Sequence, residues 1–365
     1  MKQFWIWPIA LYLFLGGLGG GMMATAAVVG LIIAPSALTS GALVWGVFIA
    51  FLILGIGTGL LVFELGQPWI FYRAFVTRTS VIKWGAVFLS ISMIAGVLFI
   101  FWELSWLTFL PFIPYEGFAQ VLLGIAGIFG LCVTIYTGVL LSSMKSRPFW
   151  NTPVLPVLFM VSGCSTGAAL LSMCIGVWPF PAEWLQVNLS TPLAALLTEE
   201  LRHILHVADA ILISLELVVL LLYVMLQFCA SNETAKAHAE RWVRGEWAGY
   251  FWGLMVCCGL VIPLLLNVTN VGGYASALIA LMGGCLLRFM IIWSYQRRVT
   301  PAELEYYTRL PQSHQDFMDY WEAGREYWTW VTPTGDVADE APADGPDEVY
   351  QTSGPNPAMT GAQEE

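Results

Sequence analysis

Residues 8–33 read PIALYLFLGGLGGGMMATAAVVGLII and contain no charged side chain. About 20 consecutive apolar residues are enough for a helix to cross the hydrocarbon core of a bilayer. A cleavable signal sequence has a shorter apolar core of about 7–15 residues, so we interpret this stretch as a retained first spanning helix. Glycines recur at a spacing of four, as in Gly16/Gly20 and Gly17/Gly21, which lets membrane helices pack closely.

The rest of the chain repeats this apolar pattern. Of its 365 residues, 58% are hydrophobic and only 11% are charged, and the mean hydropathy is +0.72. Soluble proteins carry about 25% charged residues, so the composition excludes an ordinary soluble enzyme. We therefore predict an all-α polytopic membrane protein with eight transmembrane helices. The predicted spans are 8–33, 43–66, 84–106, 118–143, 153–178, 204–228, 248–268 and 273–295.

The net charge of −10 is divided unevenly along the chain. Residues 1–298 carry 13 basic and 11 acidic side chains, whereas residues 299–365 carry 2 basic and 14 acidic side chains. This division predicts a transmembrane domain over 1–298, an aromatic and acidic interfacial segment over 299–330, and a disordered acidic tail over 331–365. The chain has no basic stripe that could neutralise phosphates, so we expect membrane lipids and no nucleic acid as partners.

Eight spans place both ends of the chain on one side of the membrane, which we call the terminal side. Its loops carry nearly all of the basic residues, whereas the opposite loops carry only Arg202. Because cytoplasmic loops are enriched in Lys and Arg, this asymmetry predicts cytoplasmic termini. The basic residues of the terminal side are Lys2, Arg73, Arg78, Lys83, Lys145, Arg147, Lys236, Arg241, Arg244, Arg297 and Arg298.

Haem, iron–sulfur clusters and other metal sites are not expected in this chain. The seven cysteines include no C-x-x-C pair, a spacing typical of structural zinc and iron–sulfur sites. Two of the four histidines, His203 and His206, lie on one predicted helix, while we place His238 in a loop and His314 in the tail. One helix cannot supply both axial ligands of a bis-histidine haem.

The sixth predicted span carries a polar stripe. Arg202, His206, Asp209 and Glu216 follow spacings of 4, 3 and 7, which place them on one helical face. Ionisable side chains inside a membrane are costly and face protein or water, so the stripe indicates a proton path, a ligand-facing surface or a structural ion-pair network. Arg288, seven residues inside the end of the last span, is expected to extend its side chain to the surface.

A second polar group is expected in the leaflet of the terminal side. Tyr136 precedes Lys145 by nine residues, a depth of about 13 Å at 1.5 Å per residue, and Tyr12 lies at a similar depth on the first span. Two phenols at matching depth, with Glu64 and Lys83 nearby, suit a flat redox-active ring whose oxygens accept hydrogen bonds.

Several motifs point to a known family. They are Trp7–Gly21 (WPIALYLFLGGLGGG), Glu64–Pro68 (ELGQP) followed by Ser80 and Trp84-Gly85, Tyr136–Leu141 (YTGVLL), Pro148–Pro153 (PFWNTP), Leu155–Phe159 (LPVLF) with Ser162-Gly163, and His206-x-x-Asp209 leading to Glu216. In this order, across residues 5–295, they resemble the NrfD/PsrC family of quinone-reactive membrane subunits of polysulfide-reductase-like complexes.

The resemblance implies two four-helix bundles that bind an exchangeable menaquinone or ubiquinone. It also implies a ferredoxin-like partner with four iron–sulfur clusters, which connects to a catalytic subunit with molybdopterin or multiple haems. Tyr136 matches the family tyrosine that hydrogen-bonds a quinone oxygen. The His and Asn that relatives present on the first span correspond here to Tyr12 and Ile9, and Ile9 cannot donate a hydrogen bond.

The expected function is that of a membrane subunit in a respiratory oxidoreductase complex of a prokaryotic inner membrane, not catalytic by itself. It would exchange electrons between quinone and the iron–sulfur partner, with proton translocation along the sixth span. The partner is expected to dock on the loops with Arg73, Arg78, Lys145 and Arg147, a face that is periplasmic in many relatives. A proton-coupled transporter and a structural membrane anchor for a peripheral redox enzyme are the alternatives.

Overall fold

The computed structural model describes residues 7–33, 41–64, 81–103, 117–145, 147–177, 191–230, 233–269 and 273–294. The predicted interfacial segment and acidic tail, residues 299–330 and 331–365, lie outside this part of the chain.

The described residues are mostly helical, and eight of the helical segments are long and apolar enough to cross a membrane. The eight predicted spans are therefore confirmed. The elements are α1 Trp7–Val28 with the π-helix η1 Val29–Ile33, α2 Gly41–Glu64, α4 Val81–Glu103, α5 Phe118–Ser142, α6 Val154–Val177, α7 Thr191–Cys229, α8 Glu233–Val243, the π-helix η5 Gly249–Val261 continued by α9 Ile262–Val268, and α10 Gly273–Trp293.

Two features of the helices differ from the sequence prediction. Helix α7 begins at Thr191, well before residue 204, where the predicted span starts. The reason is that the Leu, Ala and Glu residues between these two positions favour a helix. The segment containing His238 is the short helix α8 and not a loop. Its Ala, Lys and Glu residues are strong helix formers, although its charge prevents it from spanning the membrane.

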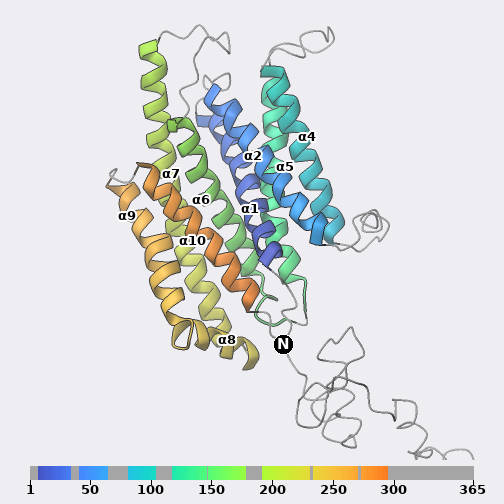
Figure 1. Ribbon diagram of the computed structural model, residues 1–365, viewed down its shortest axis with the longest axis vertical. Coiled ribbons are helices and arrows are strands. Elements are labelled where there is room, and N and C mark those ends of the chain that lie inside the picture. Colours follow the sequence, from blue (N-terminus) through green and yellow to red (C-terminus); the bar gives the residue numbers. More distant parts are fainter. Residues whose placement is uncertain are drawn as a thin grey trace, which may run out of the picture. The chain divides into compact units, whose positions relative to one another are not determined.

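The spans form two four-helix bundles side by side (Figure 1). Helices α1, α2, α4 and α5 enclose one apolar core, which includes Met23 and Phe99. Helices α6, α7, η5–α9 and α10 enclose the second core, which includes Phe159 and Met290. Helix α1 lies at the centre of the assembly because it packs against both α5 and α6.

Glycines explain how α1 can occupy this central position. A Cβ atom added to Gly20 would stand 2.5 Å from the carbonyl oxygen of Gly130 on α5, and one added to Gly21 would stand 1.9 Å from that of Gly163 on α6. Both distances are far below a carbon–oxygen contact, so only glycine allows the backbones to approach this closely. The predicted helix-packing role of the glycine pairs is confirmed at these positions.

Candidate functional site

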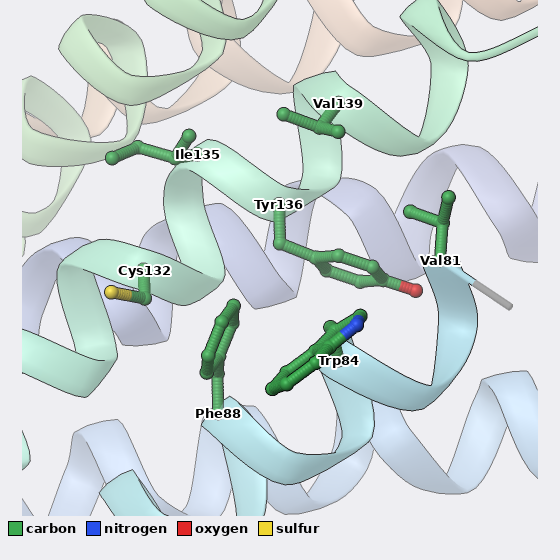
Figure 2. A pocket seen from close by; sticks show the side chains of 7 residues that line it. All are labelled: Val81, Trp84, Phe88, Cys132, Ile135, Tyr136 and Val139. Carbon is green, nitrogen blue, oxygen red and sulfur yellow. The ribbon is translucent and has the colours of Figure 1, made fainter. Parts of the chain in front are cut away.

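A cavity of about 440 Å³ opens between α4 and α5 (Figure 2). Its wall is almost entirely apolar and includes three aromatic rings. Helix α4 contributes side chains spaced by three and four residues, and α5 contributes a matching set from one face. The lining residues are Val81, Trp84, Phe88, Cys132, Ile135, Tyr136 and Val139.

Tyr136 projects from α5 into the space beside α4, with its ring next to the Trp84 indole and its hydroxyl towards Val81 (Figure 2). The side chain is buried. Its ring lies directly over the backbone of Gly85, where an added Cβ atom would stand 2.0 Å from Cζ and 2.2 Å from Cε1. Gly85 therefore provides the space that the Tyr136 ring occupies.

Tyr12 of α1 lies close to Tyr136 of α5. The structure thus brings together the two tyrosines that the sequence places at matching depth. Tyr12 is buried and is not one of the side chains that line the cavity. Ile9, one turn earlier, packs against the second apolar core.

The other residues predicted for this region, where the structure describes them, are not among the residues that line the cavity. Lys83 is half-buried on α4, next to Trp84 in sequence, but is not one of the cavity-lining residues. Glu64 is the last residue of α2. In the segment joining α5 and α6, Lys145 is exposed and Arg147 is half-buried. The predicted docking residues Arg73 and Arg78 lie outside the described residues.

A separate polar network lies inside the second bundle, centred on Asp209 of α7. The carboxylate accepts a hydrogen bond from Ser165 Oγ at 3.0 Å and another from Asn267 Nδ2 at 2.8 Å. The amide oxygen of Asn267 in turn accepts a hydrogen bond from Ser276 of α10. All four residues are buried, so the network connects α6, α7, α9 and α10 through polar groups.

Two turns along α7, Glu216 forms the second part of the network. It lies near Ser162 of α6 and near the charge of Arg288. The Arg288 guanidinium donates to Ser162 Oγ, to the carbonyl oxygen of Gly284 at 3.0 Å and to that of Phe159 at 3.4 Å. It also lies 5.0 Å from the centre of the Phe159 ring.

Arg288 corrects one expectation from the sequence. Its exposed fraction is 0%, so the side chain does not extend to the membrane surface. The reason is the set of acceptors and the counter-charge that α6, α7 and α10 present inside the bundle. Helix α1 also makes room for it, because a Cβ atom at Gly17 would stand 3.1 Å from Nη2 of Arg288.

The remaining residues of the α7 stripe lie nearer to its beginning. Arg202 and His206 are half-buried, and the Arg202 guanidinium lies 5.4 Å from the centre of the Tyr274 ring. The stripe therefore leads from partly exposed residues at Arg202 to buried carboxylates at Asp209 and Glu216. Within the described residues, no group of three or more His, Cys, Asp and Glu side chains could hold a metal ion.

An aromatic cluster on the terminal side joins α8 to the turn after α5. The carbonyl oxygen of Phe149 accepts hydrogen bonds from Tyr223 Oη at 2.5 Å and from Gln227 Nε2 at 2.7 Å. The Phe149 ring packs against His238 and Trp242 of α8. Burial, together with the charge of Arg241, lowers the pKa of His238 to about 4.

Comparison with known proteins places this geometry in a family. The sequence profile described as "Polysulphide reductase, NrfD" matches residues 1–300. The chain belongs to the polysulphide reductase NrfD family. It is 29% identical over 328 residues to Protein NrfD of Escherichia coli K12, an alignment that covers 81% of this chain and 96% of that protein. It is 30% identical over 313 residues to the C subunit of polysulfide reductase from Wolinella succinogenes, covering 80% and 94%.

A third relative of this NrfD-family chain is Protein NrfD homolog of Haemophilus influenzae, which is 29% identical over 283 residues. That alignment covers 72% of this chain and 83% of the relative. The family and the eight spans together establish a multi-pass membrane protein of the kind found as a membrane subunit of respiratory oxidoreductases.

Sequence reasoning missed several polar members of the network in the second bundle. Ser162, Ser165 and Ser276 are neutral and small, so nothing in a hydropathy pattern distinguishes them from ordinary membrane-helix serines. Asn267 offered a usable signal, because an amide inside an apolar span must find a partner. In the sequence, Gly85 and Tyr136 belong to two separate motifs, and nothing there indicates that the two residues are in contact.

Proposed function

We propose that this NrfD-family chain exchanges electrons between a membrane quinone and an iron–sulfur partner subunit. The observation that carries the proposal is the apolar, aromatic cavity between α4 and α5, in which Tyr136 is held over Gly85. Ligand pockets commonly have volumes of about 300–1,000 Å³, and the volume of about 440 Å³ falls within this range.

The residues of the cavity fit a quinone, either menaquinone or ubiquinone. A quinone is a flat ring with two hydrogen-bond acceptors and a long apolar tail, and when bound it supplies a carrier for two electrons and two protons. Trp84 and Phe88 offer faces for ring packing, and the Tyr136 hydroxyl offers a hydrogen-bond donor. Glu64 and Lys83 would supply nearby charge at the terminal side.

We further propose that the iron–sulfur partner docks on the terminal side, over Arg73, Arg78, Lys145 and Arg147. Lys145 is exposed and follows Tyr136 along the chain by about 13 Å at 1.5 Å per residue. A partner on this face would therefore lie on the side of the bundle nearest to the cavity. It would be a ferredoxin-like subunit with four clusters that delivers electrons to, or receives them from, a catalytic subunit.

The polar network in the second bundle supports a proton path along α7 through Arg202, His206, Asp209 and Glu216. Asp209 is a buried carboxylate with a hydroxyl and an amide partner, Glu216 is a second buried carboxylate on the same helix, and such groups can hold and pass protons. We place the protein in a prokaryotic inner membrane with the terminal side in the cytoplasm, since nearly all basic loop residues lie on that side.

A photoreactive azido-naphthoquinone tests the site directly. In membranes that contain the intact complex, we expect it to label peptides covering residues 81–88 and 132–139. Excess menadione should suppress the labelling, and Tyr136→Phe should reduce turnover with menadiol or menadione. Tyr250→Phe, which removes a phenol from an exposed position on η5, is the matched control.

Labelling elsewhere, together with full turnover in Tyr136→Phe, would overturn the assignment of the site. Two further results would replace the proposed function by one of its alternatives. A structural anchor would tolerate Asp209→Asn and Glu216→Gln without loss of turnover, whereas a proton-coupled transporter would purify without any iron–sulfur partner.

A further inference from the structure

We propose that Arg288 of α10 is a positioning residue of the proton path, and that its Nε hydrogen binds the Glu216 carboxylate whenever that group has lost its proton. This proposal rests on the proton path proposed above and adds a residue to it. Glu216 would have two positions inside the second bundle, one for its neutral form and one for its ionised form.

The guanidinium of Arg288 is buried with part of its donor set unused. Its exposed fraction is 0%, and Nη1 and Nη2 donate to Ser162 Oγ and to the carbonyl oxygens of Gly284 and Phe159. All three of these acceptors are neutral. Among the residues that the structure describes, nothing accepts a hydrogen bond from Nε. A buried charge that is left without a counter-charge is costly, so Nε is a favourable place for a carboxylate.

Hydrogen bonds on both sides of Glu216 define its level in the bundle. Seven residues earlier on α7, Asp209 accepts a hydrogen bond from Ser165 of α6. Seven residues later, Tyr223 donates one to the carbonyl oxygen of Phe149, just before α6 begins. A spacing of seven residues is about two helical turns, so the three α7 side chains share the face that points towards α6. Midway between the two contacts, Glu216 faces the first turns of α6.

The acceptors of Arg288 lie at this same level. Phe159 and Ser162 both belong to the first turns of α6, and Glu216 is enclosed in the same bundle with an exposed fraction of 3%. The guanidinium is held in place, because it lies 5.0 Å from the centre of the Phe159 ring and against the backbone of Gly17 on α1. The carboxylate therefore moves to the guanidinium, and not the reverse.

The two forms of Glu216 favour different positions. The neutral acid has a hydroxyl hydrogen of its own and needs no cation. The carboxylate only accepts, and a hydrogen bond with ionised partners is roughly twice as strong as one between neutral groups. When the O–H bond of the acid breaks, the electron pair stays on the carboxylate and binds at Arg288. The proton leaves through water towards Asp209, the next carboxylate on the path.

Few other charges act on this position. Helices α1 and α6 and the segment η5–α9 contain no charged side chain. Among the described residues, Asp209 of α7 and Cys285 of α10 are the other titratable groups that interact electrostatically with Glu216 or Arg288. Arg288 is therefore the cation to which an ionised Glu216 is drawn.

Infrared difference spectra of the full chain in membranes, recorded as the pH is changed, test the two positions. The acid band of Glu216 is the one that Glu216→Gln removes, and arginine labelled with ¹³C in the guanidino group reports on its partner. In the wild type we expect the acid band to disappear and a guanidinium band to shift over the same pH range. Glu216→Asp keeps an acid but withdraws it by one methylene, so the guanidinium band should stay constant. Glu240→Asp, at an exposed position on α8, is the matched control.

Arg288→Lys separates the position of the donor from its charge. Lys keeps the positive charge but lacks the planar guanidinium with its Nε hydrogen. We expect the midpoint of the Glu216 acid band to rise by about one to two pH units, since a hydrogen bond to a charged group changes an equilibrium constant about 10- to 100-fold. Proton uptake coupled to turnover with menadiol should fall in this variant and in Glu216→Asp. If Arg288→Lys does not fold, Glu216→Asp and the guanidinium band still decide the question.

Two results would overturn the proposal. A guanidinium band that stays constant while the wild-type acid band disappears would show that the carboxylate does not bind at Arg288. An acid band in Arg288→Lys with the wild-type midpoint would show that the Nε position is not used. Failure of the proton path has a different signature, because the infrared bands need no quinone. Both bands would then change together in the wild type, which confirms the ion pair, whereas Glu216→Gln would take up protons as the wild type does, which overturns the role in proton transfer.

Discussion

Replacing Gly85 by alanine should impair the cavity without removing any polar group. An added Cβ atom would stand 2.0 Å from Cζ of Tyr136. Non-bonded carbon atoms rest about 3.5–4.0 Å apart, so the ring or the helix has to move by about 1.5 Å. Overpacking of this kind costs about 1–3 kcal/mol of stability, and a displacement of about 1 Å at a reacting group can lower turnover about 100-fold.

The assay is turnover of Gly85→Ala with menadiol or menadione in membranes, together with thermal unfolding of the purified protein in detergent. Gly59→Ala on α2 is the matched control, because a Cβ atom at Gly59 meets nothing within 4 Å. We expect Gly59→Ala to retain wild-type turnover and Gly85→Ala to lose about 100-fold.

A double-mutant comparison separates the specific clash from general damage to α4. In a Tyr136→Ala background the ring is absent, so Gly85→Ala should no longer lower the unfolding temperature. Wild-type turnover in Gly85→Ala would refute the reasoning. An equal loss of stability with and without the Tyr136 ring would also refute it, because the contact between the added Cβ atom and the ring would then contribute nothing to the loss.

Three further predictions concern the second bundle and α8. Asp209→Asn removes the carboxylate that Asn267 and its neighbours satisfy but keeps the shape of the side chain. We therefore expect the proton uptake coupled to turnover to fall, while the unfolding temperature changes little. Proton uptake equal to that of the wild type would contradict the proton path. Arg288→Met leaves Glu216 without its counter-charge and should cost about 3–5 kcal/mol of stability, whereas adding Glu216→Gln should recover much of this loss in the same thermal assay. The folded-state pKa of His238 is lowered from 6.5 to about 4. Its contribution to stability is therefore complete above pH 6.5 and is lost as the pH falls towards 4. His238→Gln should flatten the dependence of the unfolding temperature on pH between these two values.

Much of the fold was predictable because it depends on local properties of the chain. A run of about 20 apolar residues must become a spanning helix, since backbone groups in a bilayer have no other way to be satisfied. The eight spans and the close helix packing at Gly20 and Gly21 followed from this rule and from glycine spacing. The matching depth of Tyr12 and Tyr136 followed from helix rise alone.

The errors have equally physical causes. Arg288 was expected at the surface because its distance from the end of a span is a local quantity, whereas its acceptors on Phe159, Ser162 and Gly284 come from two different helices. The sequence prediction places His238 in a loop, whereas the structure forms the short helix α8 there, because its Ala, Lys and Glu residues favour a helix.

The amino-acid sequence by itself determined how often the chain crosses the membrane, which side carries the basic loops, and which side chains lie at similar depth. These are one-dimensional properties, set by hydrophobic length and by helix rise. Only the tertiary structure decided that Gly85 makes room for Tyr136, that Tyr12 lies close to it, and that Asp209 and Glu216 find partners on three other helices. Those contacts join residues far apart along the chain, and the rotation and neighbours of each helix arise only when the two bundles pack.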